Sequence, residues 1–298
     1  MEKTARGIAQ RLRERGHIAY FAGGSVRDMV RGLPAKDFDI ATDATPDIVQ
    51  KIFQRTYAVG AHFGVVVVVE NESNFEVATF RSDGAYLDHR RPVEVRFSSP
   101  EEDAKRRDFT INGMFFDPEK NEVIDFVGGH ADLEKKIVRA IGDPAARFNE
   151  DRLRMLRAVR FATVLDYKID TQTWDALVAN AESINEISAE RIREELLKIF
   201  LSQNRVRGWE MLDQSGLLRA VLPELEAMKG CLQPEQFHPE GDVFVHTRLM
   251  LSQLSETVSV PLVFAVLFHD VAKPVTARVD ETGRIRFNEH DRIGAEMT

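Results

Sequence analysis

Hydrophobic and polar residues follow two different patterns along the chain. Residues 18–22, 38–41, 63–70 and 75–80 are short runs rich in β-branched and aromatic residues, separated by helical stretches, and such runs predict strands. The five consecutive valines at 65–69 suit a strand buried on both faces. A buried helix segment gives the same run, but β-branching favours the strand. Residues 1–140 are therefore expected to form an α/β or α+β unit with a mixed sheet.

The second half of the chain follows the 3.6-residue period of helices. In residues 190–201 the apolar positions Ile192, Leu196, Leu197 and Ile199 form one stripe. Strand-like alternation returns only at 284–287. Helix-breaking residues interrupt the pattern at 141–145 and at 233–241, which predicts boundaries there. The expected fold class is an α/β (α+β) head followed by an all-helical remainder.

Length and composition narrow the class of protein. A chain of 298 residues is long enough for several domains, and 43% hydrophobic with 30% charged residues is ordinary for a globular protein. No segment approaches the ~18 apolar residues of a membrane span, and the Arg-rich N-terminus lacks the apolar core of a targeting peptide, so it is expected to form a first helix. The single cysteine, Cys231, fits a reducing cytoplasm and indicates no thiol chemistry.

The distribution of charge is more informative than its sum. A net charge of −8 argues against a protein that coats nucleic acid without specificity. Basic residues are nevertheless concentrated in two stretches. Seven lysines and arginines lie within residues 81–107, and five arginines lie within residues 147–160. Basic stripes on an acidic background favour a local nucleic-acid or phosphate site.

Residues 20–28 read as a strand, a tight glycine turn and a helix that begins near Ser25. Such a turn leaves backbone N–H groups and the positive end of the helix dipole free for a triphosphate, with Arg27 one turn further along. A Gly-Gly pair before a helix is also common as a plain connection between a strand and a helix.

The pattern Asp37-Phe-Asp39 follows shortly after this turn. On a strand, residues two apart share a face, so the two carboxylates are expected to point together while Phe38 and Ile40 face the core. Paired carboxylates with room for phosphates suit two Mg²⁺ ions and nucleotidyl transfer. The alternative is a pair of solvated acids at a strand end. Glu76 is a candidate third carboxylate, or else an acid on an edge strand.

Five segments in this order resemble the motifs of class II CCA-adding enzymes and bacterial poly(A) polymerases. They are Gly23–Asp28 with 37–42, residues 106–112, residues 125–144, residues 150–157 and residues 189–196. The resemblance implies template-independent addition of C and A, from CTP and ATP, to the 3′ end of tRNA. It also implies a nucleotidyltransferase head (1–140), a nucleotide-reading neck (141–205), an RNA-binding body (206–240) and a partial HD-type domain (241–298).

The resemblance assigns roles to individual residues. Asp37 and Asp39 are implied metal ligands, with Glu76 as the further catalytic candidate. The second motif contacts the ribose and phosphates of the incoming nucleotide, and the fourth reads its base. The implied nucleotide-binding residues are Gly24, Ser25, Arg27, Arg107, Asp108, Asn112, Asp151, Arg154, Arg157 and Arg160.

A physical argument supports base reading by Asp151 and Arg154, which the periodicity places i and i+3 on one helix. Cytosine and adenine offer an amino donor beside a ring-nitrogen acceptor, whereas uracil and guanine offer the reverse. A carboxylate beside a guanidinium therefore favours C and A. Arg157 and Arg160 are expected to hold phosphate or brace the site. The alternative is an amphipathic helix with a solvated arginine face.

Two further segments bear on which nucleotides are added. Residues 81–92 read as a mobile loop beside the site, and in the family a loop here helps the change from C to A addition. Residues 60–65 resemble CCA-adding enzymes more than the arginine-rich version of the poly(A) polymerases. The loop favours adenosine addition over a CC-only activity, and residues 60–65 favour CCA addition over an A-adding or poly(A) activity.

The last segment offers a second candidate metal site. His246 and the vicinal His269-Asp270 resemble the start of an HD-type metal phosphohydrolase domain, and His290 is a further candidate ligand. Such domains need a later aspartate, and the chain is expected to be truncated inside a helix. A structural His-Asp pair is the alternative. A non-catalytic RNA-binding module would be expected to lack Asp37, Asp39 or Arg107, and all three are present.

Overall fold

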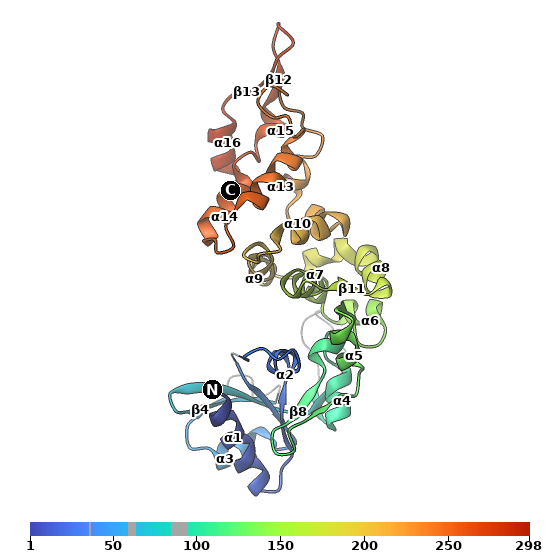
Figure 1. Ribbon diagram of the computed structural model, residues 1–298, viewed down its shortest axis with the longest axis vertical. Helices are drawn as coiled ribbons and strands as arrows, with labels where there is room; N and C mark the ends of the chain where they lie inside the picture. The colour runs from blue at the N-terminus through green and yellow to red at the C-terminus, as the bar shows by residue number, and fades with distance from the viewer. Residues whose placement is uncertain (36, 59–63, 85–94) are drawn as a thin grey trace. The chain divides into compact units, whose positions relative to one another are not determined.

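The computed structural model describes residues 1–35, 37–58, 64–84 and 95–298. Contacts divide the chain into two compact units, Met1–Asp151 and Arg152–Thr298, and each is described by itself (Figure 1). The expected division into four domains stays a prediction. Most of segments 60–65 and 81–92 lies outside the described residues, so the expectations for nucleotide choice that depend on them also stay predictions.

A mixed seven-stranded sheet forms the framework of the first unit, as predicted. Its strand order is β3-β4-β5-β2-β1-β8-β9. Strands β2 and β5 run parallel, whereas the other neighbouring pairs are antiparallel. The strands are β1 (Ala19–Ala22), β2 (Asp39–Thr42), β3 (Thr56–Tyr57), β4 (Val65–Glu70), β5 (Ser73–Thr79), β8 (Phe115–Asp117) and β9 (Glu122–Ile124).

The valine run forms strand β4, but the strand is not buried on both faces. Val66 and Val68 are fully buried, whereas Val65, Val67 and Val69 keep partial exposure. This alternation arises because β4 pairs antiparallel with β3 and β5, and an antiparallel sheet commonly packs only one face on the core. The expectation of two buried faces was therefore wrong, although the strand itself is confirmed.

The N-terminal stretch forms the expected first helix, α1 (Glu2–Glu14). Ala5, Ile8, Ala9 and Leu12 are its buried residues and lie on one face. This face packs against β1 and α3 (Pro46–Ile52). Strands β6 (Arg81–Asp83) and β7 (Val95–Phe97) pair as a separate antiparallel hairpin. The remaining elements are α2 (Gly24–Val30), α4 (Pro100–Lys105), the 3₁₀ helix η2 (Thr110–Asn112), α5 (Gly129–Glu134), β10 (Ile137–Val138) and α6 (Pro144–Glu150).

Aromatic packing fixes the backbone around the middle of this sheet. The buried ring of Phe38 meets Phe21 edge-on, with centroids 5.1 Å apart, and Phe80 meets Phe115 at 5.7 Å. Pairs of this kind add about 0.5–1.5 kcal/mol beyond the burial of area. Because Phe38 is anchored in this way, the next residue, Asp39, is held opposite Ala22 at the start of β2.

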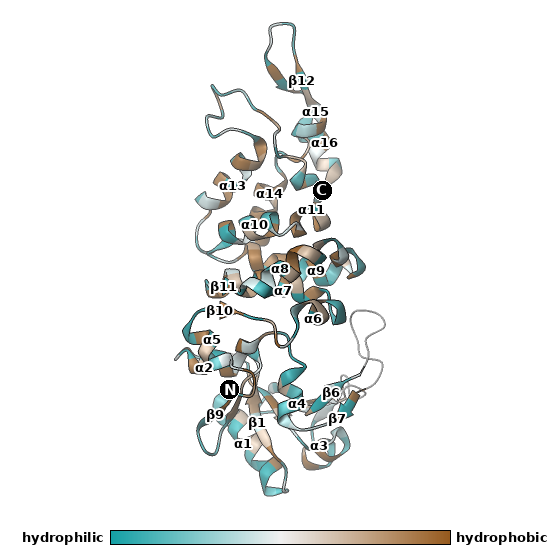
Figure 2. Ribbon diagram, turned by 90° about the vertical axis from the view of Figure 1, so that its right-hand side faces the viewer, coloured by the Kyte–Doolittle hydropathy of each residue, from teal (hydrophilic) through white to brown (hydrophobic). Residues whose placement is uncertain are grey.

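The second unit is helical, as the 3.6-residue period predicts. Helix α7 (Leu153–Leu165) packs against α9 (Ala189–Phe200) and α10 (Arg205–Gln214), and apolar and polar colours both occur along α7 and α9 (Figure 2). Gly208 permits the close approach, because a Cβ there would lie 2.4 Å from Ile199 Cγ2. The helix predicted at 190–201 is α9.

Trp209, fully buried on α10, packs against Phe244 of α13 (Val243–Gln253) with ring centroids 4.6 Å apart, which ties α13 to α10. Of the strand-like residues 284–287, Ile285–Phe287 form β13, which pairs antiparallel with β12 (Ala277–Val279). None of the described helices combines the length and the hydropathy that a membrane span requires. The other elements are β11 (Lys168–Ile169), α8 (Thr171–Asn180), η3 (Ala181–Glu186), α11 (Leu217–Val221), α12 (Pro223–Glu226), α13 (Val243–Gln253), α14 (Val260–Phe268), α15 (Lys273–Thr276), β12 (Ala277–Val279), β13 (Ile285–Phe287) and α16 (His290–Met297).

Candidate active site

The turn between β1 and α2 brings together Gly23 and Asp39 of the first motif and Arg107 of the second. Gly23 is the N-cap of α2 with φ +71°, a conformation that favours glycine. A Cβ at this position would lie 3.4 Å from Asp39 Oδ2 and 3.8 Å from Arg107 Nη1. The backbone thus comes within van der Waals distance of a candidate metal ligand and a candidate phosphate ligand, and the positive φ is what favours glycine here.

The two aspartates keep the predicted alternation, but only one lies on the strand. Phe38 and Ile40 are buried, whereas Asp37 and Asp39 are exposed. Strand β2 begins at Asp39, and Asp37 precedes it. The expectation that both aspartates lie on a strand was wrong because β1 ends at Ala22, the partner of Asp39, so the ladder extends no further back.

Glu76 lies on β5, the parallel neighbour of β2. Ile40 pairs with Val77, so Asp39 and Glu76 each come one residue earlier on adjacent strands. Strand β5 lies between β4 and β2, and the alternative that Glu76 is an edge-strand acid is therefore wrong. Glu76 therefore lies on the strand next to Asp39, where a third carboxylate would be needed. The role of Glu76 in catalysis stays a prediction.

The electrostatic environment of Asp39 suits a divalent cation. Burial of the carboxylate by surrounding protein atoms, and then the charge of Glu76, raise the pKa of Asp39 to about 6. Arg107 opposes this rise, while Asp37 adds to it. Solvent still reaches the side chain. Among residues 1–35, 37–58, 64–84 and 95–298, three carboxylates outweigh the Arg107 guanidinium here, and this surplus of negative oxygen ligands fits Mg²⁺.

Three of the predicted nucleotide-binding residues form one hydrogen-bonded cluster between α2 and η2. Arg27 Nη1 donates to Asn112 Oδ1 at 2.9 Å, and Arg27 Nε donates to Asp28 Oδ1 at 3.0 Å. Asn112 Nδ2 in turn donates to Asp108 Oδ1 at 3.2 Å. Asp108 Oδ1 also accepts the backbone N–H of Phe109. The orientation of Arg27 is thus set by the second motif.

Gly24 and Ser25 form the first turn of α2. The Arg27 guanidinium lies 3.5 Å from the Cβ position of Gly24. The Ser25 hydroxyl is buried and donates to the Ala22 carbonyl at 3.0 Å, so it stabilises the turn. Contact of these two residues with a phosphate stays a prediction.

Arg107 is held by a buried acid that the sequence analysis did not single out. Its Nε and Nη2 atoms donate to Asp103 Oδ2 at 3.1 and 3.0 Å. Its guanidinium also lies over the Phe115 ring, 5.0 Å from the centroid. Asp103 is only 2% exposed.

The third motif is explained locally by turn geometry. The Asp125 carboxylate accepts the backbone N–H groups of residues 127–130. Gly129 lies so close to the Thr110 carbonyl that a Cβ would be 2.2 Å from the oxygen. Asp132 accepts from Thr110 Oγ1 at 2.7 Å and from Arg139 Nε at 3.0 Å. These contacts stabilise the fold around η2, which carries Asn112.

The fourth motif does not form one continuous helix. Asp151 is the C-cap of α6 with an extended backbone, φ −140° and ψ 103°, and α7 begins at Leu153. The expectation that Asp151 and Arg154 sit i and i+3 on one helix was therefore wrong. Asp151 and Arg154 are three residues apart in the sequence, but they do not share a helix. Their side chains are therefore not placed one helical turn apart. Their role in reading the base stays a prediction.

Arg154, Arg157 and Arg160 lie on α7, and Arg152 is its N-cap. Arg154 is 8% exposed. Arg157 and Arg160 both lie over the Phe161 ring, at 5.4 and 3.8 Å from its centroid. Arg160 Nε donates to the buried carboxylate of Glu195 on α9. Arg160 thus braces α7 against α9, within the motif at 189–196.

In the second unit, three predicted residues come together at the second candidate metal site. Ligand atoms of His246, His269 and Asp270 lie within 4.8 Å of one another. His290 Nε2 lies 3.8 Å from Asp270 Oδ1. The C-terminal histidines thus gather around one buried carboxylate.

Hydrogen bonds fix the orientation of these imidazole rings. The Nδ1 atoms of His246, His269 and His290 contact Glu240 Oε1, the Val266 carbonyl and the Phe287 carbonyl, respectively, at 2.5–2.8 Å. When Nδ1 is the donor in such a contact, the neutral ring presents its lone pair at Nε2, as in many metal-ligating histidines.

A buried lysine already supplies a cation to this cluster. Lys273 Nζ lies 2.7 Å from Asp270 Oδ2 and donates to Gln233 Oε1 at 2.6 Å. Burial would raise the pKa of Asp270, but His269 and Lys273 outweigh it and lower the pKa to about 2. Any metal at Asp270 therefore competes with an internal ammonium group.

Sequence reasoning missed several residues of these two sites. Asp103 carries a local signal, because it lies four residues before Arg107 at helical spacing. His238 and Glu240 were read only as part of a boundary, yet Glu240 Oε1 contacts Nδ1 of both His238 and His246. A His-x-Glu pattern near a candidate ligand was the available signal. Lys273, three residues after Asp270, also lies at helical spacing.

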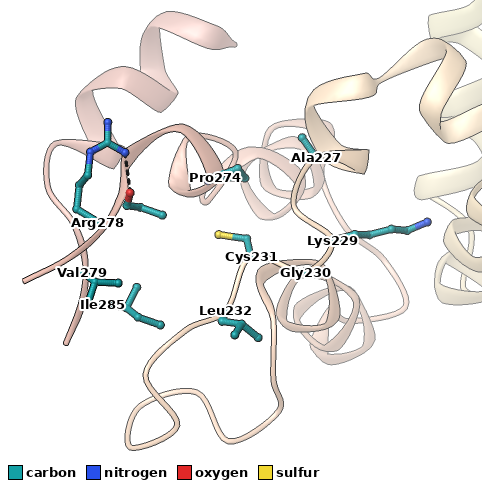
Figure 3. A pocket seen from close by; sticks show the side chains of 10 residues that line it. Ala227, Lys229, Gly230, Cys231, Leu232, Pro274, Arg278, Val279 and Ile285 are labelled. Atoms are coloured by element: carbon teal, nitrogen blue, oxygen red, sulfur yellow. Dashed lines mark hydrogen bonds between the residues drawn. The ribbon is translucent and has the colours of Figure 1, made fainter. Parts of the chain in front are cut away.

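A hollow of about 440 Å³ lies elsewhere in the second unit, beside the β12–β13 hairpin (Figure 3). The Cys231 sulfur points into it, whereas the Lys229 side chain points away. Burial raises the pKa of the Cys231 thiol. The Arg278 guanidinium donates to the neighbouring Ala277 carbonyl at 2.6 Å. None of the residues predicted to carry function lines this hollow.

Two family models match the chain. The model described as the poly A polymerase head domain matches residues 19–139, which contain the Gly23 turn, Asp39 and Arg107. The model described as the probable RNA and SrmB-binding site of polymerase A matches residues 166–229.

Curated proteins and solved structures are similar over the same region. The CCA-adding enzyme of Ligilactobacillus salivarius is 45% identical over 213 residues, which cover 71% of this chain and 52% of that protein. That of Geobacillus thermodenitrificans is 46% identical over 229 residues, with 76% and 56% covered. The crystal structure of the Bacillus stearothermophilus CCA-adding enzyme in complex with CTP matches with a TM-score of 0.69 and 40% identity, over 76% of this chain and 55% of that one. The chain thus spans about half the length of the curated relatives it matches.

Proposed function

We propose that this chain, which belongs to the nucleotidyltransferase family of CCA-adding enzymes and bacterial poly(A) polymerases, adds C and A from CTP and ATP to the 3′ end of tRNA. The meeting of Gly23, Asp39 and Arg107 at one turn carries this proposal. It supplies a carboxylate for a metal, a guanidinium for a phosphate and a backbone that approaches both. The names of the similar curated proteins support CCA addition over the poly(A) alternative.

Asp37 and Asp39 would hold Mg²⁺ in this proposal, with Glu76 as the third carboxylate. Two such ions supply activation of the ribose 3′-hydroxyl and neutralisation of the pyrophosphate. Arg107 and Arg27 would bind the triphosphate, because both guanidiniums are already oriented by hydrogen bonds within the first unit. A cytoplasmic location belongs to the proposal as well, and the single cysteine supports it.

The order of nucleotide addition tests the proposal. The chain is offered tRNA that lacks CCA, tRNA ending in one C and tRNA ending in two, with CTP and ATP supplied separately. We expect C on the first two substrates and a single A on the third. Long A tails would instead support a poly(A) polymerase. Absence of incorporation on all three, with folding confirmed by circular dichroism, would contradict the proposed activity of this chain.

Base selection by Asp151 and Arg154 is tested by changing the hydrogen-bonding groups. Asp151→Ala removes the acceptor for the amino group of C and A, so incorporation of both should fall and discrimination against UTP and GTP should weaken. The double change Asp151→Asn with Arg154→Ala should raise relative incorporation of UTP, because an amide both donates and accepts. Arg193→Ala on α9 is the control. Equal loss for all four nucleotides would mean that these residues only support the fold.

We propose as a second property that His246, His269 and Asp270 bind a divalent transition metal. The Nδ1 contacts of both histidines favour this, because they leave Nε2 as the atom that could bind a metal. His269 Nε2 already lies 3.1 Å from Asp270 Oδ2, and a metal would replace that contact. Isothermal titration with Mn²⁺ or Ni²⁺ should give a site that His246→Ala and His269→Ala weaken at least about tenfold. An unchanged affinity in both variants would leave a structural histidine cluster.

A further inference from the structure

We infer that Asp103 is the positioning residue that holds Arg107 for the incoming triphosphate, an inference that rests on the proposed nucleotidyl transfer. Asp103 lies on α4, four residues before Arg107, and its side chain is 2% exposed. Oδ2 accepts from both Nε and Nη2 of Arg107, at 3.1 and 3.0 Å. The two bonds converge on one carboxylate oxygen, so they hold the Nε–Nη2 edge of the guanidinium toward Asp103.

The second carboxylate oxygen of Asp103 is equally engaged. Oδ1 accepts from Nε and Nη2 of Arg106 at 2.9 and 2.7 Å, and from the backbone N–H of Arg81 at 3.2 Å. Burial acts to raise the pKa of Asp103, but the two arginines and their hydrogen bonds lower it below the usual value. The carboxylate therefore stays ionised, and it can orient both guanidiniums throughout the neutral range.

This arrangement leaves Arg107 with one edge directed at the site. Because Nε and Nη2 are bound to Asp103, Nη1 is the atom near the Gly23 turn, where Asp39 Oδ2 also lies. Nη1 also donates to the Asn112 carbonyl at a long 3.5 Å. The Phe115 ring lies against the same guanidinium. A released Arg107 could instead pair with the Asp39 carboxylate and compete with a metal there. Asp103 thus keeps Arg107 available for phosphate and Asp39 available for metal.

Asp103 also stabilises the β6–β7 hairpin through Arg106, which suggests a purely structural alternative. Arg106 Nε donates to the Arg81 carbonyl at 3.1 Å, and Arg106 Nη1 lies 3.6 Å from Asp83 Oδ2. Loss of Asp103 could weaken nucleotide binding by loosening this hairpin alone. A double-mutant cycle with Arg107 separates the two roles, because only a positioning role predicts non-additive effects.

The test measures binding of MgCTP by calorimetry without tRNA. Asp103→Asn should weaken binding roughly 10–100-fold, since a misplaced positioning group costs about two orders of magnitude. In an Arg107→Gln background the same change should cost less than about threefold. The matched control is Asp117→Asn, which removes another buried acid bound to an arginine, Arg13, and should stay near wild type. Additive losses, or an equal loss in Asp117→Asn, would overturn the inference.

A second readout needs no ligand. The Arg107 Nε–Hε resonance should be protected from solvent exchange in the wild type and in Asp117→Asn, lost in Asp103→Asn and partly recovered in Asp103→Glu. Unchanged protection in Asp103→Asn would overturn the inference on its own. A wild-type chain that binds neither CTP nor ATP would instead contradict the proposed function. In that case the resonance still decides whether Asp103 holds the arginine.

Discussion

Asp39 in the first unit and Asp270 in the second are the same residue type in opposite electrostatic surroundings. Burial and the charge of Glu76 raise the pKa of Asp39 to about 6, and the Arg107 guanidinium opposes them. Against the effect of burial, His269 and Lys273 lower the pKa of Asp270 to about 2. Among the described residues, the negative charge around the first carboxylate exceeds the positive, whereas the second carboxylate already has cationic partners.

This difference separates a site built for an external cation from one that is internally neutralised. A divalent ion at Asp39 relieves repulsion among carboxylates, so binding it removes an unfavourable feature of the fold. A metal at Asp270 must displace the Lys273 ammonium, which lies 2.7 Å from Oδ2. At the second site, the orientation of His246 and His269 favours metal binding, whereas the charge of Lys273 opposes it.

The largest expected difference lies in catalysis. Asp39→Ala or Asp37→Ala should lower nucleotide incorporation at least about a thousandfold, because several kcal/mol of metal-dependent stabilisation are lost. Circular dichroism should stay unchanged, since both side chains are exposed. Glu70→Gln, a surface acid at the end of β4, is the control, and Asp270→Ala should also keep most activity. Incorporation by Asp39→Ala within tenfold of wild type would contradict the metal assignment.

Removing the internal cation of the second site should strengthen metal binding there. Lys273→Met keeps the length of the side chain and deletes the ammonium, so the affinity for Mn²⁺ should rise by about tenfold. The measurement is calorimetric titration, with Lys229→Met as the control because that lysine pairs with Asp213 and Glu226 instead. An unchanged affinity would show that the ammonium does not compete.

Acid sensitivity should differ between the two aspartates. The pKa of Asp270 is lower in the folded state than its usual 3.8, so this carboxylate stabilises the fold above that value and loses the effect as the pH falls toward 2. Asp270→Asn should therefore lower Tm by about 3–6 °C at pH 7. The gap to wild type should narrow as the pH decreases, which thermal scans from pH 7 to pH 3 would measure. A gap independent of pH would point to packing as its cause.

The smallest expected effect is a change in thermal stability on replacing Asp39, and here Tm should rise, whereas it should fall for Asp270→Asn. Its folded-state pKa is about 6, so the ionised carboxylate disfavours the fold, and stability falls as the pH rises from about 4 to 7. In metal-free buffer Asp39→Asn should therefore raise Tm by about 1–3 °C at pH 7 and leave it unchanged at pH 4. A decrease at pH 7 would mean that the carboxylate contributes hydrogen bonds that outweigh its repulsion.

Much of the architecture followed from local patterns in the sequence. The runs at 18–22 and 65–69 became β1 and β4, and the helical period at 190–201 became α9, because each pattern reflects one element packing one face against a core. The ordered motifs at Gly23, Asp39 and Arg107 were also visible, since each is a short segment with its own chemistry. Their grouping at one turn was implied by the resemblance and is now given by geometry.

Contacts between distant segments were decided only by the tertiary structure. Sheet order makes Glu76 a central neighbour of Asp39, and the ends of α6 and α7 separate Asp151 from the helix of Arg154. Glu240, read as part of a boundary, proves to orient His246. Periodicity reports which face of an element is buried, but not which element buries it. The sequence by itself thus determined the elements and the reactive groups, whereas the pairing of charges at Asp39 and Asp270 depended on strand register and helix packing.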